Sequence, residues 1–128
     1  MNLTIKVSVG ELVDKISILQ IKKEKIENKE KVKSINYELN YLNIYFNELL
    51  EENSELNTLF SKLKCVNFAL WEIEDKIRIL ENNKIFNDEF IKLARSVYKT
   101  NDQRFEIKNQ INQLFNSEII EVKSYEKY

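Results

Sequence analysis

The chain contains no proline and a single glycine, Gly10, among its 128 residues. Proline and glycine most often end helices and form tight turns, so their scarcity favours long helices. Apolar residues also recur at alternating spacings of three and four, which is typical of helices with one apolar face. We therefore predict an all-α protein. Its expected form is an antiparallel helical bundle of three to four long helices, in a single domain over residues 1–128.

Polar residues, rather than proline or glycine, are predicted to bound the first helices. Ser8 and Glu11 have the spacing of a capping box, in which Ser8 caps the first helix and Glu11 reaches back. The apolar stripe of the first half lapses into charged residues at 28–31. A bend or break is predicted there, which gives four helices, and one continuous helix over 9–52 is the alternative.

Two further turns are predicted in the second half of the chain. The polar segment 51–54 is expected to end one helix, and Ser54 is a candidate cap for the next. The polar segment 81–87 is expected to form the second turn, with Asn87 capping the last helix. Both segments separate stretches of regular apolar spacing.

The two ends of the chain are expected to be extended. Leu3, Ile5 and Val7 alternate with polar residues, a short strand pattern. The tail at 118–128 is too apolar for a free end, so we expect it to pack on the bundle. Alternatively, residues 119–122 pair with residues 3–7.

The composition excludes several classes of function. No histidine is present and Cys65 is the only cysteine, so His-based catalysis, zinc sites and an intramolecular disulfide are not expected. The net charge is -1, which predicts neither a nucleic-acid partner nor a membrane surface. The start of the chain does not resemble a signal peptide. We therefore expect a cytoplasmic protein without a cofactor, a metal or catalytic residues.

Arginine is rare in this lysine-rich chain, with only Arg78, Arg95 and Arg104 present. Its planar fork binds carboxylates and phosphates in a bidentate manner, which lysine does not. Four polar residues also fall on or near apolar stripes, where unpaired groups are costly. They are Asn67, Glu74, Asn101 and Lys108. These features predict either a polar pocket for an anionic ligand or a buried ion-pair network. The candidate ligand-binding residues are Lys15, Asp75, Arg78, Arg95, Tyr98, Asp102 and Arg104.

The first helix carries two conspicuous charges and the glycine. Antiparallel packing would bring Asp14 and Lys15 towards the last helix, as partners for Arg95 or Asp102. Gly10 lies in the first turn, where free amides could bind phosphate, although a plain helix cap is the favoured interpretation.

Clustered carboxylates offer one enzymatic alternative. Their spacing matches the acidic motif of MazG-like all-α nucleotide pyrophosphatases, which hold magnesium between helices. The match is weak because acidic residues are abundant in this chain. A turn is also predicted within the motif, which would keep its side chains from facing one site. The residues concerned are Glu51, Glu52, Glu55, Glu72 and Asp75.

Four segments resemble an uncharacterised family of short bacterial and phage proteins, a domain of unknown function. They are VSVGELVDKISIL near the start, LWEIEDKIR at 70–78, LARSVYKTNDQR at 93–104 and EVKSYEKY at the end. The resemblance implies no activity, ligand or catalytic residue. It does suggest that seven charged residues of these segments meet in space, namely Asp14, Lys15, Asp75, Arg78, Arg95, Asp102 and Arg104.

The sequence is therefore most consistent with a non-enzymatic module that acts through a protein partner or as a homodimer. The sustained apolar stripe and the two-faced first helix favour this hypothesis. Binding of, or action on, an anionic small molecule is the second hypothesis. A magnesium-dependent pyrophosphatase is the third.

Overall fold

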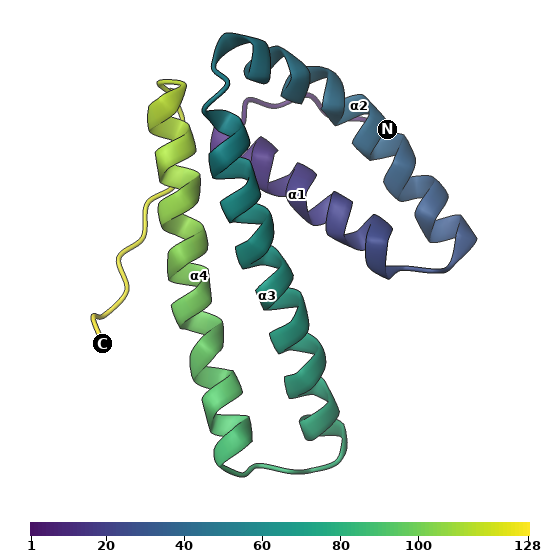
Figure 1. The fold of residues 1–128 in the computed structure, drawn as a ribbon, viewed down its shortest axis with the longest axis vertical. Helices are drawn as coiled ribbons and strands as arrows, with labels where there is room; N and C mark the ends of the chain where they lie inside the picture. The colour runs from purple at the N-terminus through teal and green to yellow at the C-terminus, as the bar shows by residue number, and fades with distance from the viewer.

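A computed structural model describes all 128 residues and contains four helices and no strand. The first two helices form one hairpin and the last two form a longer antiparallel hairpin, against which α1 packs (Figure 1). The prediction of an all-α helical bundle is confirmed. The helices are α1 (Val9–Lys25), α2 (Lys29–Glu52), α3 (Leu56–Asn82) and α4 (Asp88–Leu114).

Side-chain caps begin three of the four helices. Ser8, Asn28 and Asn87 each accept a hydrogen bond from the backbone N–H three residues later, at 3.1, 3.0 and 3.1 Å. The caps at Ser8 and Asn87 and the break before α2 were predicted. The prediction of a cap at Ser54 is wrong, because α3 begins after Glu55 without a side-chain cap. Burial of the first residue of α3, Leu56, anchors that end of the helix instead.

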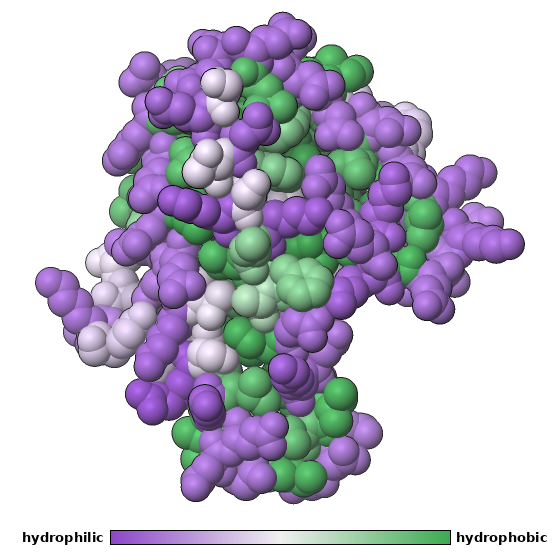
Figure 2. Space-filling model, in the orientation of Figure 1, coloured by the Kyte–Doolittle hydropathy of each residue, from purple (hydrophilic) through white to green (hydrophobic).

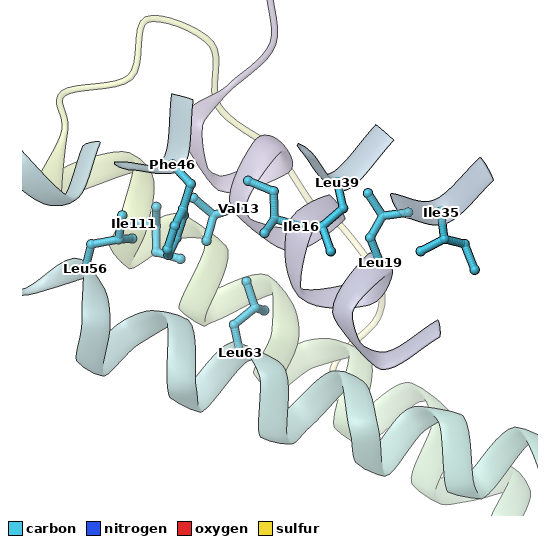
Figure 3. Packing of buried hydrophobic residues seen from close by; sticks show 9 residues of the cluster. All are labelled: Val13, Ile16, Leu19, Ile35, Leu39, Phe46, Leu56, Leu63 and Ile111. Carbon is cyan, nitrogen blue, oxygen red and sulfur yellow. The ribbon is translucent and has the colours of Figure 1, made fainter. Parts of the chain in front are cut away.

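The hydrophobic core lies where α1 contacts the other three helices (Figure 3). Helix α1 buries residues on adjacent faces, as its two apolar stripes predicted, because α2 covers one side and the α3–α4 hairpin covers another. The core residues are Val13, Ile16 and Leu19 of α1, Ile35, Leu39 and Phe46 of α2, Leu56 and Leu63 of α3, and Ile111 of α4.

Helix α1 covers only part of the α3–α4 hairpin. At ~1.5 Å per residue, its 17 residues span about 26 Å, whereas the 27 residues of α3 span about 40 Å. The hairpin therefore extends past α1, as Figure 1 shows. No residue from 68 to 107 is buried. We call this segment the distal hairpin.

The two ends of the chain lie apart and form no strand. Residues 3–7 are exposed and form no strand, so the predicted strand is wrong. They also do not pair with residues 119–122. The tail lies beside α4 (Figure 1), where Lys123 is 3.8 Å from Asp102 and the ring of Tyr128 contacts that of Tyr98. Polar and edge contacts, rather than burial of its apolar side chains, hold the tail. None of the four helices combines the length and apolar character needed to cross a membrane.

Candidate functional site

A buried polar network joins α1, α3 and α4. The Asp14 carboxylate, only 3% exposed, accepts two hydrogen bonds from Arg104, one of them from Nε at 3.0 Å. Asn67 donates to Asp14 at 2.9 Å and to the hydroxyl of Ser17 at 2.7 Å. Ser17 in turn donates to the Asp14 carbonyl oxygen. The hydrogen bonds to Asp14 raise the pKa of the Arg104 guanidinium.

A second polar contact lies one turn further along α4. The buried ammonium group of Lys108 lies 2.6 Å from a carboxylate oxygen of Glu11 and 2.9 Å from one of Glu121. The expectation that Glu11 completes a capping box is therefore wrong, because its carboxylate binds Lys108 instead of the first-turn backbone. The contact ties the start of α1 and the tail to α4.

Lys108 should make stability depend on pH in the alkaline range. Burial lowers its pKa, but the bonds to Glu11 and Glu121 outweigh this, and the pKa lies above its ordinary value of 10.5. The folded state thus holds the proton more tightly, so the contribution is complete below pH 10.5 and is lost as the pH rises through the folded pKa. In urea unfolding from about pH 8 to about pH 12, Lys108→Met should lose stability less steeply than wild type. The exposed tail substitution Lys127→Met should keep the wild-type slope, and equal slopes for all three proteins would refute the assignment.

The amino end of α1 has no amide left for an anion. The N–H of Val9 donates to the Ser117 hydroxyl, and that of Gly10 donates to the side chain of Asn112 at 2.6 Å. Glu11 donates to the Ser8 cap. The phosphate alternative at Gly10 is therefore unsupported. The glycine instead permits close approach to α4, since a Cβ there would lie 2.6 Å from the Lys108 carbonyl oxygen.

An open pocket of about 470 Å³ adjoins the Asp14–Arg104 network, where α1 ends against the α3–α4 hairpin. Two isoleucines of α1 form one wall, and α3 contributes most of the lining. The lining residues are Ile18 and Ile21 of α1, Asn67, Leu70, Trp71, Glu74, Asp75 and Arg78 of α3, and Asn101 and Arg104 of α4.

The pocket brings together three of the seven candidate residues, namely Asp75, Arg78 and Arg104. Arg78 donates from Nε to Glu74 at 3.1 Å on the exposed rim. Arg104 lies deeper and binds Asp14. The sequence placed these residues near one another, and the fold adds a cavity between them.

The other four candidate residues lie elsewhere. Lys15 points to α2, where its ammonium group is 2.6 Å from Glu38, so the predicted contact of Lys15 with α4 is wrong. Asp14 does reach α4, but its partner is Arg104 rather than Arg95 or Asp102. Tyr98 and Asp102 contact the carboxyl-terminal tail, and Arg95 is exposed on the distal hairpin.

Comparison with known proteins identifies a family. A family of unknown function (DUF6165) matches residues 3–128. The chain belongs to this family. The DUF6165 match includes the buried network, the pocket and the distal hairpin, and it confirms the resemblance to a domain of unknown function. No curated protein and no solved structure matches the chain.

The carboxylates of the pyrophosphatase alternative do not assemble. No group of three or more acidic or cysteine side chains is placed to hold a metal ion. Glu72 binds Lys25 at 3.0 Å, while Glu51 and Glu52 lie at the far end of α2. The spacing in the sequence thus does not produce a common site.

The sequence did not indicate that two polar residues of this region take part in buried hydrogen bonds. Ser17 closes the buried network and Asn112 receives the Gly10 amide. Serine and asparagine are too common for their type alone to signal this. By contrast, the position of Asn67 and Lys108 on apolar stripes was informative, since both are buried and bonded. Trp71, the only tryptophan, lines the pocket.

Proposed function

We propose that the protein is a non-enzymatic interaction module that associates with a second copy of itself through the distal hairpin. The observation that carries this proposal is the excess of exposed surface. The accessible surface is 9454 Å², whereas a compact monomer of 15.4 kDa exposes about 7,200 Å². The difference, about 2,200 Å², exceeds the ~800 Å² that each partner buries in a standard interface.

The distal hairpin contributes six of the 19 large apolar residues that are exposed. Two helices alone bury side chains only along their shared seam, so their outer faces need further helices. Figure 2 shows apolar side chains at the surface near the α3–α4 turn. The large exposed apolar residues of the distal hairpin are Phe68, Ile79, Ile85, Phe86, Ile91 and Tyr98.

The charges of the distal hairpin favour a second copy over a highly charged partner. Residues 68–107 contain eight acidic and seven basic side chains. Two such surfaces do not repel each other, and a nucleic acid would find no excess of positive charge. Two distal hairpins packed together form a four-helix bundle, which buries the outer faces of both.

The test is the mass of the protein in solution, measured by light scattering and sedimentation over a range of concentrations. Wild type should be a dimer, and the double variant Ile79→Asp with Ile91→Asp should be a monomer of unchanged helicity. Ile44→Asp is the matched control, because Ile44 on α2 is 59% exposed, against 60% for Ile79 and 52% for Ile91. A monomeric wild type, or a dimer that Ile44→Asp dissociates and the double variant does not, would overturn the proposal.

A further inference from the structure

The pocket beside the Asp14–Arg104 network has a preorganised polar floor. Asn67 is 5% exposed and uses both amide hydrogens, on Asp14 and on Ser17, so its amide orientation is fixed. Its carbonyl oxygen takes part in none of the protein's hydrogen bonds, and it is not sealed from the pocket. Arg104 uses Nε and one terminal nitrogen on Asp14, which leaves its other terminal nitrogen as a donor. The lining of the pocket thus includes one residue with an unused acceptor and one with an unused donor.

The residues around the pocket carry no net positive charge. The buried Asp14 carboxylate neutralises Arg104, and Glu74 neutralises Arg78 on the rim. Asp75 adds a further negative charge. A bare phosphate would meet these carboxylates as well as the guanidinium groups, so the pocket suits an uncharged ligand better than the anion expected from the sequence.

The remaining lining supplies complementary groups for a hydroxyl-bearing ring. A hydroxyl group can donate a hydrogen bond to the Asp75 carboxylate or to the Asn67 carbonyl oxygen. It can also accept a hydrogen bond from Arg104. Trp71 adds an aromatic side chain to the lining, and the apolar face of a sugar ring packs favourably on an aromatic ring. The volume, about 470 Å³, lies within the ~300–1,000 Å³ range of small-molecule sites. We propose that this pocket, which lies at the end of the distal hairpin that faces α1, binds an uncharged sugar of monosaccharide size.

Trp71 is the only tryptophan in the chain, so all tryptophan fluorescence comes from the lining of the pocket. The titrations are made at one fixed protein concentration, so that the extent of self-association starts the same in each. We would titrate the full-length protein with glucose, galactose, mannose and N-acetylglucosamine, and in parallel with glucose 6-phosphate and inorganic phosphate. The Trp71 indole and the Asn67 and Asn101 amides would be followed by NMR in the same samples. At least one neutral sugar should produce a saturable change in both signals.

Variants separate binding at the pocket from a general effect. Asp75→Asn changes an exposed lining residue and should weaken sugar binding about tenfold or more, because it removes a charged hydrogen-bond acceptor. Glu81→Gln, a matched exposed change on α3 outside the pocket, should leave the affinity unchanged. Saturation by inorganic phosphate with no response to neutral sugars would overturn the proposal. A response to no probe, or equal affinity in wild type and Asp75→Asn, would overturn it as well.

Discussion

Replacing Asp14 with alanine is expected to lower the free energy of unfolding by about 3–5 kcal/mol. The substitution leaves the guanidinium of Arg104 without its carboxylate, and Asn67 loses one of its two hydrogen bonds in the buried network. The Ser17 hydroxyl keeps its bond, because its acceptor is the backbone carbonyl oxygen of residue 14. Removing the buried carboxylate is costly because Arg104, whose side chain is 29% exposed, then loses its charged partner in a partly desolvated position. Urea unfolding followed by far-UV circular dichroism measures the effect directly.

The adjacent residue provides the control for this change. Lys15 also forms an ion pair on α1, but the pair is on the surface, so Lys15→Ala should cost no more than ~1 kcal/mol. A double variant that lacks both Asp14 and Arg104 should be more stable than the sum of the two single changes predicts. Equal losses for Asp14→Ala and Lys15→Ala would contradict the structural role of the network.

The second large effect is expected at Gly10. Glycine to alanine within a helix usually stabilises a protein by about 0.5–1 kcal/mol, but here we expect destabilisation by about 2–4 kcal/mol. An added Cβ would lie 2.6 Å from the Lys108 carbonyl oxygen and 2.9 Å from the Asn112 side chain, so α1 would have to move away from α4. That movement also weakens the hydrogen bond from the Gly10 N–H to Asn112.

Thermal and urea unfolding of Gly10→Ala would test this sign reversal. The control is Asn40→Ala, an exposed position within α2 where alanine should be neutral or slightly stabilising. Stabilisation by Gly10→Ala would show that the two helices do not approach so closely. It would then return the amino end of α1 to consideration as an anion site.

The network and the pocket share Asn67 and Arg104, but the network concerns stability and the pocket concerns ligand binding. The sequence left open whether its rare arginines brace the fold or bind a ligand. In the structure Arg104 stabilises the fold through its bonds to Asp14 and also lines the pocket, whereas Arg78 lies on the exposed rim. Loss of Asp14 should therefore reduce stability, and loss of Asp75 should reduce only binding.

The sequence by itself determined the helical class and the caps at Ser8 and Asn87, and it favoured the break before α2 over one continuous helix. These features depend on residues within a few positions of one another, where side-chain chemistry acts on the local backbone. It also identified Asn67 and Lys108 as polar residues on apolar faces, because helical periodicity assigns each position to a side of its helix.

Only the tertiary structure decided which residues on those faces meet. Arg95 and Arg104 are nine residues apart, about 13 Å along α4, and periodicity does not say which of them lies level with Asp14. The relative position and crossing of the helices are set by side-chain packing of the core and by the close contact at Gly10. The same packing turned Lys15 towards α2 and opened the pocket between three helices. It left the part of the distal hairpin nearest the α3–α4 turn uncovered, because α1 is shorter than α3.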